Sequence, residues 1–567
     1  MVFGSAITNP AAVVASTSKL RRALISVLQS DAKFPGGAMA TGALSNSEFA
    51  LINFMVRSRP CVSRVSTIDA FMDSIMLAST ASNPNALAIA FGIGVAGLVV
   101  LALIIRALRS HTLALGFATT AAQWALAYVA MIGPGQLLGD ALFALTLACP
   151  IVAGFVAARA MRDQASPLGV GCVSGFVNLL VVGALVGGGS SDTAMIIQGA
   201  FWSVGMLVGS GVLALFGAWL APRIFTNAGA ATTSQWSWPA PAALFAMVAA
   251  ATIFLLLITG GLVTGLEAGL AVPDWPNSFG HNMLLYPVSE MKGGVYYEHA
   301  HRLFGMLVGV TTFTMVLVVF REDRRTWVRA LACFALFMVC VQGLMGGLRV
   351  TGTLTLSQES AQLTPSTLIA IAHGIFGQIV FATMALLAAL LTMQWKSTVA
   401  LRDFAGASSV RVLTLIAPCV LLVQLFLGAS YRHLQVPPHD GLPAYHPIWA
   451  MHGHIGFSIV AALAVLLAAS RMSAAARETQ ALKLLGTCAT FLITVLIAQV
   501  LLGLLAYVAV LVRRDAAIPL WELMFTSAHQ VTGALLFASA IQGAAWARRL
   551  VSALAIHESR TAALSSR

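Results

Sequence analysis

Four histidines in the second half of the chain are each followed, four residues later, by glycine at the start of an apolar run. The four segments are His301-Arg-Leu-Phe-Gly305, His373-Gly-Ile-Phe-Gly377, His452-Gly-His-Ile-Gly456 and His529-Gln-Val-Thr-Gly533. With 12 histidines and 49 glycines in 567 residues, chance supplies about one such pair. Residues four apart share a helix face. The pattern therefore predicts four helices that each present one imidazole at a common membrane depth.

Four imidazoles, one from each helix, can form two facing pairs. Haem iron accepts an axial ligand on each face of the porphyrin, and helical bundles supply such ligands from opposite helices. A glycine one turn below each histidine would remove the side chain where the flat porphyrin lies close to the backbone. A single such histidine would more often be an interfacial residue beside a packing glycine. Four in register instead favour iron ligation by His301, His373, His452 and His529.

One carboxylate distinguishes the first of these sites. Glu298 lies three residues before His301, whereas the other three histidines have alanine, tryptophan or threonine at that offset. An acid beside only one pair predicts one reactive site and a second site that stores or passes electrons. The carboxyl group could relay protons or hold a polar intermediate. The alternative is an ion pair between Glu298 and Arg302.

The third ligand has two candidates, because His452-Gly-His454 also matches His299-Ala-His301 as a His-x-His segment. The His-to-Gly offset favours His452, as does the similar spacing of His301 from Arg321, at 20 positions, and of His452 from Arg471, at 19. A second repeat precedes three of the histidines: Gln342-x-x-x-Gly346, Gln424-x-x-x-Gly428 and Gln499-x-x-x-Gly503. Spacing from that glutamine, 30 residues against 28, favours His454. We predict His452 as the ligand, with His454 as the alternative.

Membrane helices must position these residues. Only 9% of the residues are charged, 59% are hydrophobic and the mean hydropathy is +0.87, whereas soluble proteins carry about 25% charged residues. This composition excludes a water-soluble enzyme and predicts an all-α polytopic membrane protein. The thirteen predicted spans lie at about 85–106, 112–133, 137–159, 168–188, 195–221, 240–262, 301–320, 328–349, 366–393, 411–431, 448–470, 482–511 and 523–547.

The net charge of +12 comes from basic residues at the ends of the apolar runs, so a nucleic-acid partner is excluded and the lipid bilayer is expected. Basic residues in alternate loops, including Arg321–Arg325, Lys396 and the tail from Arg548, predict that this side is cytoplasmic. The loops at 263–300 and 432–447 then face outwards. Arg513 and Arg514 are an exception on that outer side. Seven cysteines without a CxxC motif argue against a zinc site, an iron–sulfur cluster or a disulfide framework.

The predicted organisation has six parts. Residues 1–80 are weakly periodic and suggest a disordered segment or a mis-assigned start. A five-helix membrane domain at 81–222 and a polar linker at 223–239 precede the four-helix halves at 240–400 and 401–550, and a tail follows at 551–567. Few polar groups fall within the first five spans, and they form no ligand-like set. We therefore expect that domain to serve packing, assembly or partner docking.

Residues 240–547 resemble the haem A synthase family, the membrane enzymes that complete haem A for haem–copper terminal oxidases. The most specific segments are Gly260-Gly-Leu-Val-Thr-Gly265, Gly269-Leu-Ala-Val-Pro-Asp-Trp-Pro276 and Glu298-His-Ala-His-Arg302. The second half matches more loosely, through His452, His529 and the helix pattern. Some members of the family have a cysteine pair in the first outer loop. Residues 263–300 have none, which excludes thiol-dependent electron delivery through that loop.

The resemblance implies an eight-helix bundle of two four-helix halves that oxidises the C8 methyl group of haem O to a formyl group. By similarity, His301 and His373 would hold haem O as the substrate, and Glu298 would be the catalytic carboxylate. His452 and His529 would bind a resident haem b. The implied partners are a haem O synthase, the assembly machinery of the terminal oxidase and an unidentified electron donor. The expected location is the bacterial inner membrane.

Two other function classes fit part of the sequence. A quinol-linked cytochrome b, in which both bis-histidine haems only relay electrons, explains the four histidines without Glu298. A transporter or metal-handling protein could use histidines as proton or metal sites, but transporters commonly place such residues in helices broken near mid-membrane. Here the histidines open the helices.

Overall fold

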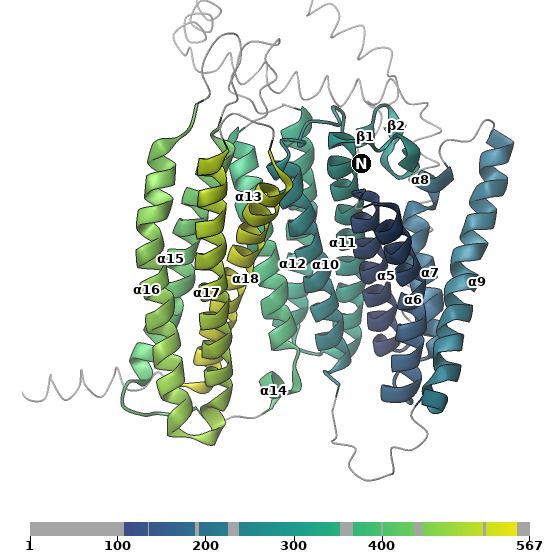
Figure 1. Cartoon of the computed structure of the whole chain (residues 1–567). Coiled ribbons are helices and arrows are strands. Elements are labelled where there is room, and N and C mark those ends of the chain that lie inside the picture. The colour runs from purple at the N-terminus through teal and green to yellow at the C-terminus, as the bar shows by residue number, and fades with distance from the viewer. Residues whose placement is uncertain are drawn as a thin grey trace, which may run out of the picture. The chain divides into compact units, whose positions relative to one another are not determined.

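Long helices form almost the whole of the described chain (Figure 1). The computed structural model describes residues 107–133, 135–186, 192–224, 238–351, 367–397, 401–435, 445–513 and 518–552. Within these residues, eleven helical segments are long and apolar enough to cross a membrane. The prediction of an all-α polytopic membrane protein is confirmed. The predicted span at 85–106 and residues 1–80 lie outside the described residues.

The helices before residue 225 pack closely through small residues. They are α5 (Ser110–Met131), α6 (Gln136–Ala160), α7 (Pro167–Asn178), the 3-10 turn η1 (Leu179–Val181), α8 (Val182–Val186) and α9 (Asp192–Ile224). A Cβ added at Gly154 or Gly171 would collide with the backbone of α9, at Ala214 or Ser210 respectively. Glycine at these positions lets the backbones approach, as in many membrane helix pairs. The predicted span at 168–188 corresponds to α7 and α8, which the 3-10 turn η1 separates.

Polar side chains inside these spans satisfy one another. Gln123 Oε1 accepts hydrogen bonds from Ser174 Oγ and from Asn178 Nδ2, both at 2.9 Å. Asn178 Oδ1 accepts from Trp124 Nε1 at 2.9 Å, and Gln123 Nε2 donates to the Thr146 carbonyl at 3.1 Å. Interhelical hydrogen bonds of this kind hold membrane helices together. The network therefore supports a packing role for α5, α6 and α7. Residues 225–237 of the predicted linker lie outside the described residues.

Eight further helices follow, one for each predicted span between 240 and 547. They are α10 (Pro241–Gly265), α11 (Gly294–Glu322), α12 (Thr326–Thr351), α13 (Thr367–Leu390), α15 (Ala407–His433), α16 (Ile448–Glu478), α17 (Lys483–Val512) and α18 (Leu520–Leu550). Helices α10, α13, α15 and α18 contact one another at the centre, with α11 and α12 against one side and α16 and α17 against the other. The short α14 (Met393–Lys396) lies between the two halves of the sequence.

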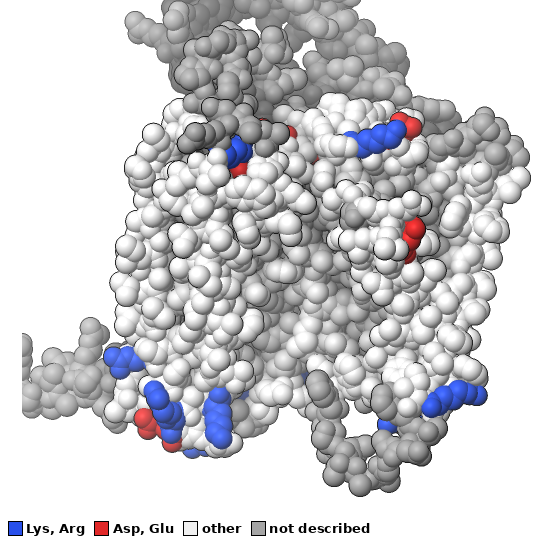
Figure 2. Space-filling model, in the orientation of Figure 1, with Lys and Arg blue, Asp and Glu red and all other residues white. Residues whose placement is uncertain are grey.

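The surface of the helices suits a bilayer. Figure 2 shows basic and acidic atoms gathered at the two ends, with the visible surface between them almost entirely uncharged. Large apolar side chains lie exposed on that surface, among them Ile459 at 65% and Leu504 at 60%. Helix α18 is less apolar than the others because it lies in the interior. There Gln542 Nε2 donates to the Ala385 carbonyl of α13 at 2.6 Å.

A cluster of three charged side chains lies at the end of the molecule that carries α14. Asp323, buried between α11 and α12, accepts from Arg325 Nη2 at 2.7 Å and lies 3.1 Å from Lys396 Nζ. Burial alone would raise the pKa of Asp323, but the hydrogen bonds and charges of Arg325 and Lys396 outweigh it and hold that pKa well below its usual range. The cluster joins the α11–α12 turn to α14. Its cytoplasmic location remains a prediction from the basic loops.

Helix α5 braces the helix that carries His301. The rings of Tyr128 in α5 and Tyr296 in α11 stack with centroids 5.3 Å apart, and the Tyr296 hydroxyl donates to the Tyr128 carbonyl at 2.6 Å. Trp124 of α5 meets Phe304 of α11 edge to face at 5.6 Å. Such aromatic pairs add to the free energy of burying the rings. Helix α11 is therefore fixed from the side of α5 as well as by its own half.

Candidate functional site

Each of four imidazoles lies against a glycine on the helix that precedes it. A Cβ added at these glycines would overlap the ring, at the following distances from its Cε1 atom: Gly260 to His301 2.9 Å, Gly346 to His373 3.2 Å, Gly428 to His454 2.8 Å and Gly503 to His529 2.7 Å. The four contacts come from α10 and α11, α12 and α13, α15 and α16, and α17 and α18. The same contact, a glycine of one helix against a histidine of the next, therefore occurs four times.

The ring that faces His529 belongs to His454. The two ring centroids lie 6.1 Å apart with the planes at 90°. His452, which the sequence favours as the ligand, is exposed instead. The structure thus places His454, the alternative named from the sequence, opposite His529. The same two-residue register makes His299 the counterpart of His452.

A glutamine on the preceding helix sets this register. Gln424 Nε2 donates to the backbone carbonyl of His454 at 2.9 Å, 30 residues away, and Gln342 Nε2 donates to that of His373 at 2.8 Å, 31 residues away. Gln499 Nε2 lies 3.4 Å from His529 Nε2, again 30 residues away. The glutamine spacing is therefore the reliable signal, because it reports a contact between consecutive helices.

The glycines four residues after the histidines have different roles. An added Cβ would lie 3.0 Å from Gln342 Nε2 at Gly377, and 3.1 Å from Gln499 Nε2 at Gly533. In these two helices the glycine makes room for the glutamine amide. No described atom lies within 4 Å of a Cβ added at Gly305 or Gly456. The His-to-Gly offset that favours His452 thus marks no protein contact at Gly456.

Hydrogen bonds fix the tautomer of both imidazoles in the C-terminal half. His454 Nδ1 lies 3.1 Å from the Gln424 carbonyl oxygen, and His529 Nδ1 lies 3.2 Å from that of Gln499. A carbonyl oxygen only accepts, so each Nδ1 must carry the proton. Each Nε2 then keeps its lone pair, which is the form of histidine that binds a metal.

The N-terminal half anchors its imidazoles less evenly. Thr259 donates its hydroxyl proton to the Leu256 carbonyl at 2.9 Å, so its oxygen accepts from His301 Nδ1, also at 2.9 Å. His373 Nδ1 faces the Gln342 carbonyl without forming a hydrogen bond. His301 therefore presents Nε2 as His454 and His529 do, while His373 Nδ1 lacks a comparable hydrogen bond among the described residues.

Glu298 holds the outer loop. Its side chain is buried, with Oε1 accepting from Arg302 Nη2 at 2.7 Å and Oε2 accepting from the Val272 backbone N–H at 2.8 Å. Arg302 also donates to the carbonyls of Val272, Asp274 and Asn277 at 2.7–2.9 Å. The ion pair considered as the alternative role of Glu298 is thus present, and it clamps the loop that follows α10 onto α11.

The loop is further fixed by its own side chains. Asp274 accepts from the backbone N–H groups of Phe279 at 2.6 Å and Gly280 at 2.8 Å, which closes the turn beside the short hairpin of β1 (Asn277–Ser278) and β2 (His281–Asn282). The Trp275 ring contacts Gly347 near the end of α12. The characteristic Pro-Asp-Trp-Pro segment therefore spans from α10 across to α12 at the imidazole end of the N-terminal half.

Several charged residues at this end were not singled out by the sequence pattern. Arg513, the exception in the charge distribution, pairs with the buried Glu522 at 3.2 Å. Arg432 Nη2 donates to the Thr264 carbonyl at 2.6 Å and so links α15 to α10. Arg349 lies within electrostatic range of His373, and His373 lies within that of His433. The only sequence signal for these residues is their place at the ends of apolar runs.

The donor set fits iron in a porphyrin better than a bare metal ion. Among the described residues, no group of three or more His, Cys, Asp and Glu side chains could hold a metal ion. A porphyrin supplies four ligands itself, so its iron needs only two imidazoles from the protein. Paired imidazoles with glycines opposite the rings therefore fit a haem.

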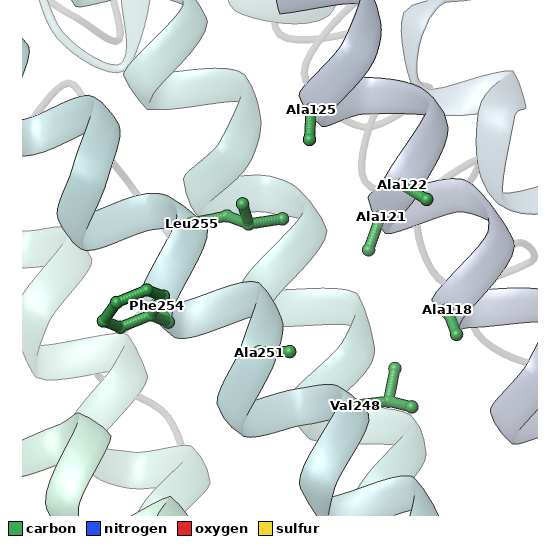
Figure 3. A pocket seen from close by; sticks show the side chains of 8 residues that line it. All are labelled: Ala118, Ala121, Ala122, Ala125, Val248, Ala251, Phe254 and Leu255. Carbon is green, nitrogen blue, oxygen red and sulfur yellow. The ribbon is translucent and has the colours of Figure 1, made fainter. Parts of the chain in front are cut away.

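A separate cavity of about 320 Å³ lies between α5 and α10 (Figure 3). Alanines 118, 121 and 125 of α5 face Val248, Ala251 and Leu255 of α10 across it. All of its lining side chains are apolar, whereas ligand sites combine apolar walls with a few placed polar groups. The cavity therefore adds nothing to the chemistry of the histidines.

Comparison with known proteins now adds to this geometry. The family described as cytochrome oxidase assembly protein matches residues 243–541, a range that contains all four paired imidazoles and confirms the resemblance found in the sequence. Heme A synthase from Parvibaculum lavamentivorans is 26% identical over 241 residues, which cover 35% of this chain and 66% of the relative. The chain thus spans slightly less than two thirds of that relative. Because the family match covers more than half of its residues, the chain belongs to the family of cytochrome oxidase assembly proteins.

Proposed function

We propose that this chain is a haem A synthase, a membrane oxidoreductase that oxidises the C8 methyl group of haem O to a formyl group. The observation that carries the proposal is two imidazole pairs built in the same way, of which only the first lies beside a buried Glu298–Arg302 clamp. Membership of the family and the name of the relative, Heme A synthase, support the same class of reaction.

The two halves take different roles in this proposal. His454 and His529 would hold a resident haem b, since a hydrogen bond from each Nδ1 orients both rings. His301 and His373 would hold the substrate haem O, and His373, whose Nδ1 is not hydrogen-bonded, is the ligand better suited to exchange. Hydrogen bonds on the second nitrogen fix a ligating histidine and strengthen it as a ligand. When bound, the haem iron supplies the one-electron and oxygen chemistry.

Glu298 would act beside the substrate in two ways. Its bonds to Val272 and Arg302 keep the outer loop over the first imidazole pair and so limit the access of water. As the catalytic carboxylate, it would also accept or return a proton near His301, three residues along the same helix. Replacement by glutamine separates these roles, because an amide oxygen can still accept from Val272 while the negative charge is lost.

The test is extraction and chromatography of the haems from purified protein, expressed with and without a haem O synthase. We expect haem b alone without that partner, and haem O, hydroxylated haem and haem A with it. For the haem b site, H454A is the test variant and H452A is its matched control, and the haem b content of the two is compared. Haem b under both conditions, with no oxidised product, would contradict the proposal.

The second candidate function is a quinol-linked cytochrome b. The near-equivalence of the four histidine–glycine contacts favours it, because two electron-relaying haems need no catalytic carboxylate. The same extraction separates the two, since a relay forms no haem A. If the synthase is correct, a haem O synthase supplies its substrate and the assembly machinery of a terminal oxidase receives its product, in a bacterial inner membrane.

A further inference from the structure

Arg349 is a cation at the first imidazole pair to which the described residues supply no paired counter-charge. It lies in the last turn of α12, three residues beyond Gly346, the glycine that contacts His373. Its Nε atom is buried without a hydrogen-bond partner, and among the described residues its guanidinium forms no ion pair. Glu298 is within electrostatic range, but both of its oxygens are already bound by Arg302 and Val272.

The position of the guanidinium is defined by the outer loop and three helices. It lies against the outer loop, where a Cβ added at Gly269 would be 2.7 Å from Arg349 Nη2. His301 of α11 and His373 of α13 both lie within its electrostatic range. His433 of α15 approaches from another side, with its Nε2 atom 3.6 Å from a Cβ added at Gly374. Arg349 therefore lies at the outer edge of the space between the two imidazoles.

The other described arginines at this end have partners. Arg302 is bound by Glu298 and three carbonyls, Arg513 pairs with Glu522, and Arg432 donates to the Thr264 carbonyl. A buried charge without a partner is strongly unfavourable. Among the described residues, an anion bound at Arg349, with the second basic group His433 nearby, would compensate this buried positive charge.

We propose that Arg349 binds a carboxylate of the tetrapyrrole held between His301 and His373. This inference rests on the proposed function, since it requires a porphyrin at that pair. The guanidinium fork matches a carboxylate in two hydrogen bonds, a geometry that lysine does not provide. A propionate of haem O bound there would turn the acidic edge of the substrate towards the outer loop. The apolar edge would then face the membrane interior.

The test compares haem O with its dimethyl ester, in which both carboxylates are neutral. Each is titrated into the full-length, haem b-loaded protein in phosphatidylcholine nanodiscs, and the binding that H301A abolishes is assigned to the first pair. Hydrogen bonds to charged groups predict a preference of about 10- to 100-fold for the free acid. R349Q should remove that preference, with both ligands bound as weakly as the ester binds to the unchanged protein, and R349K should restore part of it.

The matched control is R324Q, which removes the same charge from an exposed position in the α11–α12 turn. It should keep the full preference. A preference that survives in R349Q overturns the inference while leaving the proposed function intact. A lipid phosphate as the true ligand would show as phosphatidylglycerol retained by the unchanged protein but not by R349Q, without any acid–ester preference. If H301A abolishes no haem binding, both the inference and the proposed function fail.

Discussion

Adding one methyl group at Gly428 should release the resident haem b. The new Cβ would lie 2.8 Å from Cε1 of His454, whereas carbon atoms in contact lie about 3.5–4.0 Å apart. The imidazole must therefore retreat by about 1 Å. Metal–ligand distances tolerate only about 0.2 Å, so the ring cannot both avoid the methyl group and keep its bond to iron.

The expected loss can be estimated from the packing. Overfilling a packed interior costs about 1–3 kcal/mol, and each 1.4 kcal/mol is a factor of ten in affinity. G428A should thus weaken haem b binding by about 5- to 150-fold, if the helices yield, and more if the ligand is lost altogether. The assay is the reduced-minus-oxidised absorbance of haem b per mole of purified protein, measured before and after competition with apomyoglobin.

The matched control is G456A, where no described atom lies within 4 Å of the added Cβ. Alanine also favours a helix over glycine, so this variant should retain its haem b and fold at least as well. The comparison tests the register directly, because Gly456 belongs to the His452 pattern and Gly428 contacts His454. Full haem b content in G428A together with loss in G456A would show that the geometric argument for His454 is wrong.

Three further predictions follow from the same contacts. H454A should lose haem b while H452A keeps it, and equal haem content in the two variants would contradict the pairing of His454 with His529. E298Q should keep the loop and the bound haems but lose haem A, whereas E298A should also loosen the loop, seen as faster proteolysis within 266–293. The pKa of Asp323 is lowered in the folded protein. The ionised carboxylate therefore stabilises the fold fully above the ordinary pKa of aspartate, about 4. This contribution is lost as the pH falls towards the lowered pKa. D323N should therefore lower Tm at pH 7 and remove part of its fall at acid pH, and an unchanged Tm profile would argue against the cluster.

The sequence predicts the helices well because a bilayer imposes a simple rule on them. Each apolar run between 240 and 547 contains one helix, and the recurring Gln-x-x-x-Gly segments mark where α12, α15 and α17 contact their successors. The choice between His452 and His454 depends on how α15 and α16 are rotated against each other. Two sequence spacings disagree there, and only the one that reflects contact between the helices, from Gln424, gives the pair that the structure shows.

The outer polar groups are harder to predict because their partners are remote in sequence or belong to the backbone. Arg432 binds a carbonyl 168 residues away in α10, and no side-chain pattern reports a carbonyl. Arg302 and Glu298 are neighbours in sequence, so their ion pair was foreseeable, but their grip on the Val272 segment was not. Arg349 becomes conspicuous only when its neighbours are known and none of them supplies a free carboxylate.

The contact between the first helices and α11 decides which sides of the N-terminal half remain open to lipid. Helix α5 covers α10 and α11, and α8 reaches the outer loop, where a Cβ added at Gly183 would lie 2.5 Å from the Leu284 carbonyl oxygen. In contrast, only 22% of the apolar stretch of α12 is buried. Among the described helices, the N-terminal half is therefore covered at α5 and more exposed at α12. We expect a hydrophobic molecule that diffuses in the bilayer to approach this half from α12 rather than from α5.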